Sequence, residues 1–343
     1  MMHEVTQRTL YKEERMQTLF RNKHLITLQE WTREEIDTLL ETSKHLKLMF
    51  AMGQPHRYLQ DKTAFMIFFE QSTRTRNSVE AGITQLGGHA HDLTPDKMQL
   101  SHGESAKDTA MVLSRFGHGI AIRNCFYGIG NKYLREVAHY SSIPIINLQD
   151  DLYHPLQALA DLMTIQEKFG STQGLKVTIS WAYATSHAKP LSVPLSQILL
   201  FTRYGMDVTV AAPTEFPLLP DLVAQADQNA QQHGGKLSFV DNMDEGFKGA
   251  HVVIPKNWGG FACTQDPKEM SANLEKYKSW ICNEQRMALA SKDVVYMHAL
   301  PADRGKEVTD AVIDGPHSII YDEAENRLHT VKAVMALTMG GRP

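Results

Sequence analysis

The sequence has few of the features that mark exported or membrane proteins. It contains only three cysteines, Cys125, Cys263 and Cys282, which are odd in number and far apart. Such a set is typical of reduced thiols in a cytoplasmic protein. No apolar run reaches the roughly 18 residues needed to cross a bilayer. The first residues, as far as Gln17, are polar and of mixed charge, unlike a signal peptide. We therefore expect a cytoplasmic protein without membrane contact.

The sequence also lacks an excess of one charge and the usual cofactor motifs. The 35 Lys and Arg and the 39 Asp and Glu give a net charge of −4, spread along the chain, which argues against nucleic-acid binding. Gly128-Ile-Gly130 lacks the third glycine of a dinucleotide fingerprint, and no P-loop is present. His89 and His91 have no further residues that complete a metal-ligand set. We expect neither a metal nor an organic cofactor.

What the chain does have is length and a repeated strand–loop–helix pattern. Its 343 residues, 42% of them hydrophobic, suit two domains of about 150 residues each. Short apolar runs alternate with helical stretches, which predicts an α/β fold of two doubly wound parallel-sheet domains. The predicted strands are 63–69, 119–122, 144–147, 176–180, 207–212, 250–254, 293–297 and 318–321.

The domain boundary is predicted near residue 150. Residues 1–152 form the first domain and 153–324 the second, and a C-terminal helix, 325–343, returns to the first. Residues 30–50 have apolar side chains at three- and four-residue spacing, which predicts an amphipathic helix. In such folds ligands bind at the carboxyl ends of the strands. The residues there are polar: Ser72–Arg76, Arg123, His154, Trp181, Lys256 and His298.

Two motifs at predicted helix starts have both a functional and a structural interpretation. Ser72-Thr73-Arg74-Thr75 offers backbone N–H groups, hydroxyls and a guanidinium to an anion such as phosphate. The same residues also suit an ordinary helix cap with solvated arginines. His154-Pro155-Leu156-Gln157 has proline at the first helical position. Its His and Gln either face a ligand carbonyl and amide or are satisfied structural residues.

Taken in order, these motifs resemble the aspartate/ornithine carbamoyltransferase superfamily from about residue 20 to the end. The resemblance depends on Ser72–Arg76, Arg123, His154–Gln157, His298–Pro301 and the segment from Asp322 to Leu337. Several stretches, such as Ser180–Tyr183 with Lys189–Leu191 and Pro255–Trp258, look closest to the knotted branch. That branch includes N-acetylornithine carbamoyltransferase and uncharacterised transcarbamylases. The resemblance therefore implies a knot in the second domain, formed by Tyr183–Pro194, although knots are rare.

The resemblance also implies roles for individual residues. Carbamoyl phosphate would be bound by Ser72, Thr73, Arg74, Thr75, Arg123, His154, Gln157, Arg327 and the Leu300 carbonyl. Of these, Thr75, Arg123 and His154 would be catalytic, because they would stabilise the oxyanion that forms when an amine attacks the carbamoyl carbon. Gln99 would come from the neighbouring subunit of a homotrimer, or would lie in an ordinary surface turn. The Leu300–Pro301 bond is predicted to be cis, which X–Pro bonds tolerate.

The part of the predicted site that would bind the acceptor amine differs from that of the ornithine enzymes. Their Asp and Ser-Met-Gly loop is replaced by Pro255–Gly259, and the cysteine of their His-Cys-Leu-Pro motif is Ala299. Asp303 and Glu307 stand where the acetylornithine enzymes have an arginine and a lysine that can be carboxylated. Glu307 is either a mimic of that modified lysine or a surface carboxylate. The residues expected to bind the acceptor are Asp150, Trp181, Lys189, Lys256, Asn257, Trp258, His298 and Asp303.

The acceptor is therefore expected to be a neutral or acidic amine, acylated or ureido-like, rather than free ornithine. Lysine at position 256 favours a carboxylate or carbonyl on the acceptor. Three alternatives remain open at this point. The chain could be an ornithine or N-acetylornithine carbamoyltransferase, a non-catalytic carbamoyl phosphate-binding protein, or a nicotinamide-dependent dehydrogenase on a similar scaffold.

Overall fold

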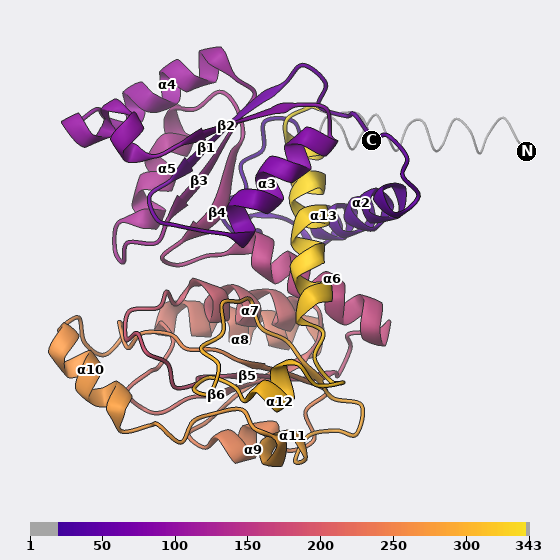
Figure 1. The fold of residues 1–343 in the computed structure, drawn as a ribbon, viewed down its shortest axis with the longest axis vertical. Coiled ribbons are helices and arrows are strands. Elements are labelled where there is room, and N and C mark those ends of the chain that lie inside the picture. Colours follow the sequence, from indigo (N-terminus) through magenta and orange to yellow (C-terminus); the bar gives the residue numbers. More distant parts are fainter. Residues whose placement is uncertain (1–19, 341–343) are drawn as a thin grey trace, which may run out of the picture. The chain divides into compact units, whose positions relative to one another are not determined.

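The structure, a computed structural model, describes residues 20–340 and divides into two compact units (Figure 1). Unit 1 comprises the residues up to Asp150 together with those from Arg327 onward, and unit 2 comprises Asp151–Asn326. These boundaries lie two residues from the predicted positions 152 and 324. Among residues 20–340, no helix has both the length and the apolar composition needed to cross a membrane.

Unit 1 contains a four-stranded parallel sheet with strand order β2-β1-β3-β4. Side chains such as Ile67 and Ile120 pack against Leu134 and Val137 on one face, which α4 and α5 cover, while α2, α3 and α13 lie on the other side (Figure 1). The elements are η1 (Leu28–Glu30), α2 (Arg33–Ala51), β1 (Thr63–Phe68), α3 (Arg74–Gln85), β2 (His89–Leu93), η2 (Pro95–Lys97), η3 (Gln99–His102), α4 (Ala106–Phe116), β3 (Gly119–Asn124), α5 (Gly130–Tyr140) and β4 (Ile145–Asp150).

Unit 2 contains a five-stranded parallel sheet with strand order β7-β6-β5-β8-β9. Helices α7 and α8 lie on one side of β5 and β6, and the short α9 and α11 lie on the other (Figure 1). The elements are α6 (Pro155–Phe169), β5 (Lys176–Ser180), α7 (Ser192–Arg203), β6 (Asp207–Ala211), α8 (Pro220–His233), β7 (Lys236–Val240), α9 (Met243–Phe247), β8 (Val252–Pro255), α10 (Pro267–Glu275), α11 (Glu284–Met287), β9 (Val295–Tyr296) and α12 (Asp310–Ile313). Helix α13 (Ile320–Thr338) begins in unit 2 and runs into unit 1.

The predicted amphipathic helix at 30–50 is α2, and its start has a clear local cause. Thr32 accepts a hydrogen bond from the Glu35 backbone N–H, and the Glu35 carboxylate accepts one from the Thr32 N–H. This capping box satisfies two N–H groups that a helix start otherwise leaves unpaired. Its buried face, with Ile36, Leu39 and Leu46, follows the spacing of the apolar residues.

The predicted strand at 318–321 is wrong. Only Ser318 pairs with the sheet, in an isolated bridge to Tyr296, and α13 begins at Ile320. The run Ile319-Ile320-Tyr321 is rich in residues that favour strands, but a short apolar run also suits the first turn of a helix. Strands β2 and β7 were not predicted from the sequence; both are edge strands whose side chains are exposed or only half-buried.

The carboxyl ends of the strands have two irregular features. The register between β3 and β4 shifts between Ile122 and Arg123, and such a bulge changes the direction of the side chains that follow it. After β9, the Leu300–Pro301 peptide is cis, which confirms the prediction, and Leu300 itself has a φ of 51°. A positive φ is rare for a residue other than glycine and is found mostly where function or packing requires it.

Candidate active site

In unit 1, the motif Ser72–Thr75 lies at the start of α3, as the sequence predicts. Thr73 is the N-cap residue, yet within the described structure its side chain makes no capping hydrogen bond. Thr75 is buried, and its hydroxyl accepts a hydrogen bond of 2.9 Å from Nη2 of Arg327, which lies on α13. The structure therefore brings two of the predicted phosphate-binding residues together from positions 252 apart in the chain.

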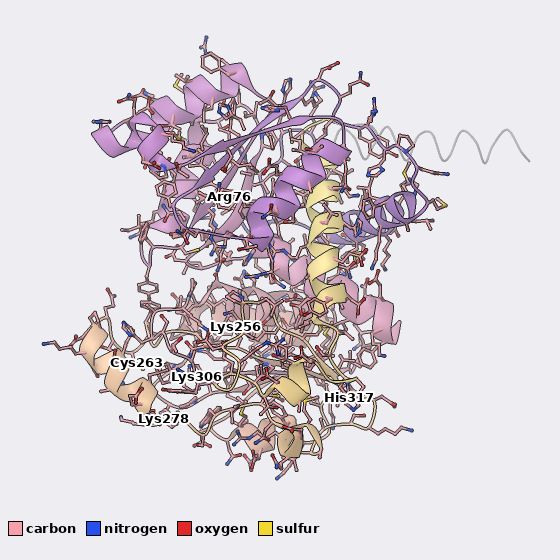
Figure 2. All side chains as sticks on the ribbon, in the orientation of Figure 1. Arg76, Lys256, Cys263, Lys278, Lys306 and His317 are labelled. Carbon is pink, nitrogen blue, oxygen red and sulfur yellow. The ribbon has the colours of Figure 1, made fainter. Side chains whose placement is uncertain are left out.

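The last arginine of the motif has a different environment. Arg76 forms an ion pair with Asp92 of β2, and its guanidinium lies 4.1 Å from the centre of the Phe68 ring (Figure 2). An arginine with a carboxylate and an aromatic face as partners serves packing. This distinguishes Arg76 from Arg74, which the family resemblance assigns to the phosphate.

Arg123 is held from two sides at the end of β3. Its Nη1 donates to the Gln149 side-chain oxygen, and its Nε lies 3.9 Å from the Glu70 carboxylate. Within the described residues, Arg123 Nε and the nearer Glu70 oxygen are buried and make no hydrogen bond. The other Glu70 oxygen accepts the Cys125 backbone N–H at 2.8 Å. Burial raises the pKa of Glu70, partly offset by the Cys125 N–H and by the Arg123 charge.

Glu70 and Gln149 are thus functional candidates that the sequence interpretation missed. Glu70 follows the carboxyl end of β1 and Gln149 lies at the carboxyl end of β4, where ligands bind in such folds. Their effect is to fix the direction of the Arg123 guanidinium. Gln99, in contrast, is exposed on η3, while Met98 and Leu100 on either side of it pack against the core of unit 1.

In unit 2, His154 and Gln157 lie in the first turn of α6. His154 is the N-cap residue, Pro155 occupies the first helical position, and the His154 backbone N–H donates to the Ser196 hydroxyl at 2.7 Å. Both side chains are almost completely buried. The Gln157 Nε2 donates to Asp161 at 2.7 Å and to Glu323 at 2.8 Å. The two residues are therefore held rigidly at a buried helix start.

The segment after β9 is organised by His298. Its backbone N–H donates to Glu323 at 2.8 Å, and its Nδ1 accepts the Leu300 N–H at 2.8 Å. With Nδ1 as acceptor, the proton of the neutral ring is on Nε2, which lies 3.5 Å from the Glu307 carboxylate. Burial lowers the pKa of His298, although Glu307 opposes this effect. These contacts fix the Leu300 backbone, whose carbonyl the resemblance assigns to the carbamoyl nitrogen.

Glu307 is fully buried, so the alternative of a surface carboxylate is wrong. It accepts the Asn257 N–H at 2.7 Å and the Asp303 N–H at 2.6 Å, and it lies 3.2 Å from Lys189 Nζ. Burial works to raise the pKa of Glu307, but the His298 contact and the charges of Lys256 and Lys189 outweigh it and lower the pKa. A single carboxylate therefore connects the segments that follow β5, β8 and β9.

The other predicted acceptor residues differ in exposure. Lys189 has its ammonium between Asp303, at 3.4 Å, and Glu307. Asp303 also accepts the backbone N–H and the hydroxyl of Thr185. Lys256, at the end of β8, is partly exposed and makes a long 3.4 Å contact with the Asn257 carbonyl oxygen (Figure 2). Asn257 is buried and donates to the Ala182 carbonyl.

Three residues expected to bind the acceptor are buried and have structural contacts. Trp181 and Trp258 are completely buried, and their indole N–H groups donate to the carbonyls of Trp258 and Phe216. Trp181 also stacks on Phe216, with ring centres 4.5 Å apart. Asp150 is buried in unit 1, where its carboxylate accepts hydrogen bonds from Asn131 and Asn147. Their polar atoms are engaged within the core, so we leave them out of the proposed acceptor site.

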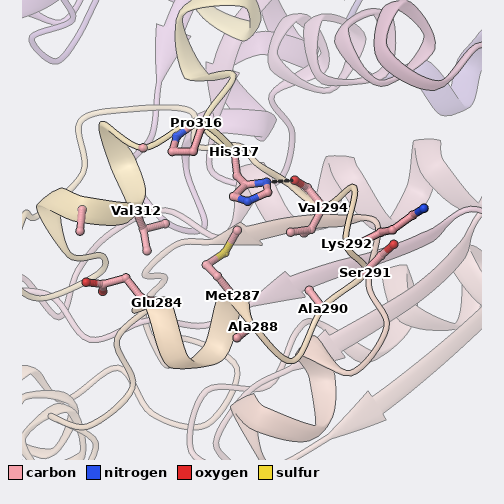
Figure 3. A pocket seen from close by; sticks show the side chains of 12 residues that line it. Glu284, Met287, Ala288, Ala290, Ser291, Lys292, Val294, Val312, Pro316 and His317 are labelled. Carbon is pink, nitrogen blue, oxygen red and sulfur yellow. Dashed lines mark hydrogen bonds between the residues drawn. The ribbon is translucent and has the colours of Figure 1, made fainter.

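One cavity of unit 2 lies away from the candidate residues. A cavity of about 360 Å³ lies among α11, α12 and the segment leading into β9, lined by residues such as Met287, Val294, Val312 and His317 (Figure 3). His317 Nδ1 donates to the Val294 carbonyl at 2.9 Å. The cavity lies on the amino side of β9, and none of the candidate residues lines it. We therefore place the chemistry at the carboxyl ends of the strands.

Comparison with known proteins gives matches over both units. Residues 23–167 match the carbamoyl-P binding domain of aspartate/ornithine carbamoyltransferases, and residues 174–338 match their Asp/Orn binding domain. Ornithine carbamoyltransferase from Thermococcus kodakarensis is 40% identical over 319 residues, which cover 93% of this chain and 97% of that protein. The corresponding protein from Halalkalibacterium halodurans is 40% identical over 323 residues, covering 94% and 96%.

Two solved structures are similar over nearly their whole length. Ornithine carbamoyltransferase from Pyrococcus furiosus has a TM-score of 0.85 at 39% identity, covering 94% of this chain and 98% of its own. Acetylornithine transcarbamylase complexed with acetylcitrulline has a TM-score of 0.83 at 34% identity, covering 92% and 98%. The similarity in fold therefore extends over more than nine-tenths of the chain.

Proposed function

Because the chain belongs to the aspartate/ornithine carbamoyltransferase family and is a carbamoyltransferase, we propose that it carbamoylates the amine of an acylated, ureido-like or acidic small molecule. Carbamoyl phosphate is the donor and phosphate the second product. The observation that best supports carbamoyl phosphate as the donor is the hydrogen bond between Arg327 and Thr75. It brings the guanidinium of the C-terminal helix to the anion-binding start of α3.

In the proposed reaction, the amine lone pair attacks the carbamoyl carbon and forms a C–N bond. The C–O bond to phosphate then breaks, and the departing phosphate takes the bonding electrons and accepts the amine proton. Thr75, Arg123 and His154 stabilise the intermediate oxyanion, each contributing about 3–4 kcal/mol as such donors usually do. Arg74 and Arg327 stabilise the negative charge that grows on the phosphate. Orientation of the two bound substrates supplies the rest of the rate enhancement.

The acceptor assignment is supported by the charges after β5, β8 and β9. Lys189 and Lys256 lie near the buried Glu307, whose oxygens are directed toward two backbone N–H groups and the Lys189 ammonium. Glu307 is thus occupied inside the unit, whereas Lys256 is partly exposed at the end of β8. A cation at that position favours an acceptor with a carboxylate or carbonyl.

Free ornithine is the second candidate acceptor. The relatives named ornithine carbamoyltransferase are 40% identical to this chain, which favours ornithine. The replacement of their acceptor loop by Pro255–Gly259 favours a different amine. A screen of amines with carbamoyl phosphate, followed by phosphate release, separates the two. We expect N-acylated or ureido-type amines to be carbamoylated faster than L-ornithine. A kcat/KM for L-ornithine above about 10⁴ M⁻¹s⁻¹ would overturn the proposal in favour of ornithine.

Lys256→Ala is expected to raise the KM for the acceptor at least about tenfold, because it removes a charge-assisted contact. The KM for carbamoyl phosphate should change by less than about twofold, since the donor-binding residues remain in place. Lys306→Ala is the matched control, because Lys306 lies over the Tyr183 ring at 6.0 Å on the neighbouring segment and is not assigned to a substrate (Figure 2). Equal changes in both KM values would remove Lys256 from the acceptor site.

A further inference from the structure

A chain of buried hydrogen bonds in unit 2 surrounds the Gln157 side chain. Its Nε2 donates one hydrogen bond to Asp161 Oδ1 at 2.7 Å and another to Glu323 Oε1 at 2.8 Å. An amide nitrogen has two hydrogens, so the two carboxylates engage both. Gln157, Asp161 and Glu323 are each at most 1% exposed. The two carboxylates thereby fix the position of the carboxamide nitrogen. They accept hydrogen bonds from this nitrogen and not from the carboxamide oxygen, which is itself an acceptor.

Both carboxylates are themselves held by donors that fix their orientation. The second oxygen of Asp161 accepts from Gln197 Nε2 at 2.7 Å, within the same buried layer. The second oxygen of Glu323 accepts the His298 backbone N–H at 2.8 Å. A backbone N–H cannot turn away, so Glu323 has to present an acceptor to it. The side chain of His298 in turn accepts the Leu300 N–H. Glu323 therefore connects Gln157 with the segment that ends at the Leu300 carbonyl.

We propose that Asp161 and Glu323 are positioning residues that make Gln157 an obligatory hydrogen-bond acceptor for the carbamoyl NH₂ group. This inference rests on the proposed function, in which Gln157 and the Leu300 carbonyl bind the amide end of carbamoyl phosphate. The carbamoyl nitrogen has two hydrogens and needs two acceptors. An unrestrained glutamine can rotate its amide by half a turn and present a donor instead. The two carboxylates disfavour the rotated orientation, because it would place the carboxamide oxygen against them. The site therefore selects a ligand with an amide over one with a methyl or carboxylate group.

The arrangement makes the effect of neutral substitutions predictable. In Glu323→Gln, the carbonyl oxygen has to face the His298 N–H, so the new NH₂ faces Gln157. In Asp161→Asn, the oxygen faces Gln197 and the new NH₂ again faces Gln157. In each single variant, one of the two carboxylates that accept from Gln157 Nε2 is replaced by an amide that presents a donor. The double variant presents two donors, which favours a Gln157 that accepts from the protein and donates to the ligand.

The test measures the binding of three probes to the full-length protein: phosphonoacetamide, phosphonoacetate and inorganic phosphate. Wild type should bind phosphonoacetamide more tightly than phosphonoacetate. We expect each single variant to reduce this preference by about tenfold to a hundredfold, as for a lost hydrogen bond to a charged group. The double variant should reverse the preference. Affinity for inorganic phosphate should stay within about twofold, because phosphate has no amide end.

Controls separate a positioning role from a structural one. The matched control is Glu167→Gln. Glu167 lies on α6, like Gln157 and Asp161, and its carboxylate accepts a hydrogen bond from Asn326 at 2.8 Å. This variant should leave the preference for phosphonoacetamide over phosphonoacetate unchanged. Far-ultraviolet circular dichroism and thermal unfolding establish that each variant is folded. Equal losses of affinity for all three probes, or an unchanged amide preference in folded variants of an active enzyme, would overturn the positioning role. If wild type neither releases phosphate with any amine nor prefers the amide probe, the proposed function fails together with this inference.

Discussion

At the scale of single residues, the neighbouring Arg74 and Arg76 have different proposed roles, and the contacts of Arg76 distinguish it from Arg74. Arg74→Ala and Arg123→Ala should each lower kcat/KM at least about a hundredfold, because each removes a charge-assisted contact to developing charge. Arg76→Ala is the control in the same motif, since Arg76 pairs with Asp92 and covers Phe68. It should cost stability but keep kcat/KM within a few-fold of wild type. Steady-state kinetics of the three variants decides this, and near-normal activity of Arg74→Ala or Arg123→Ala would refute the phosphate-site assignment.

The sequence identified the residues that are proposed to contact the ligand. Ser72–Thr75, Arg123, His154 and Gln157 follow predicted strands or begin helices, so spacing and chemistry single them out. The residues that hold them could not be identified in this way. Glu70 reaches Arg123 from another strand, and Glu323 reaches Gln157 across 166 positions of sequence. Such partners depend on tertiary packing, for which no local pattern exists.

At the scale of helices and strands, prediction worked where apolar side chains mark a buried element. The strands with an apolar run, such as β1 and β5, lie where the sequence placed them. The edge strands β2 and β7 were missed. β2 reads His-Ala-His-Asp-Leu and β7 reads Lys-Leu-Ser-Phe-Val, so neither begins with a continuous apolar run, and none of their side chains is fully buried. Trp181 and Trp258 show the reverse case. They follow predicted strands, where a ligand is expected, but in the structure their indole N–H groups donate to neighbouring backbone carbonyls in the core.

Helix α13 provides a prediction about stability and pH. Lys332 is completely buried; its ammonium donates to His56 Nε2 and Gln85 and lies 5.1 Å from the centre of the Phe50 ring. Burial lowers the pKa of Lys332 from 10.5 to about 8. Between these values the unfolded chain binds more protons than the folded one, so stability rises with pH in this window. Below it, the cost of burying the charge is fully present.

The corresponding experiment compares wild type with Lys332→Met from pH 7.5 to pH 10.5. We expect the melting temperature of wild type to rise relative to the variant by roughly 2–4 °C across this range. Lys132→Met, at an exposed position on α5, is the control and should show no such trend. A difference between wild type and Lys332→Met that is constant with pH would show that Lys332 is not buried as a charge.

At the scale of the whole molecule, the two-unit organisation and the return of the last helix followed from length and pattern. Helix α13 belongs mostly to unit 1, although unit 2 precedes it in sequence. The knot of Tyr183–Pro194 stays a prediction. Backbone contacts tie this part of the chain to later segments, through Tyr183 to Trp280 and through Lys189 to Gly259. Patterns within the sequence do not encode such crossings, because a knot is a property of the complete path.

The homotrimer stays a prediction as well, and the surface of unit 1 supports it. Met111, Val112 and Phe116 lie exposed along α4, and Phe116 is 71% exposed. Apolar side chains grouped on one helix face favour contact with another subunit. Gln99 is exposed on η3, as a residue that reaches a neighbouring active site needs to be.

Subunit exchange tests the trimer and the shared site together. Arg74→Ala and Gln99→Glu should each be inactive alone, the second because it places a negative charge near the phosphate. In a cyclic trimer, every mixed assembly contains one junction at which an intact Arg74 meets an intact Gln99. An equal mixture should therefore recover about a quarter of wild-type activity after exchange. Mixing Arg74→Ala with the Arg74→Ala, Gln99→Glu double variant creates no intact junction and should recover nothing. Light scattering that gives a monomer, or no recovery in the first mixture after verified exchange, would exclude a site shared between subunits.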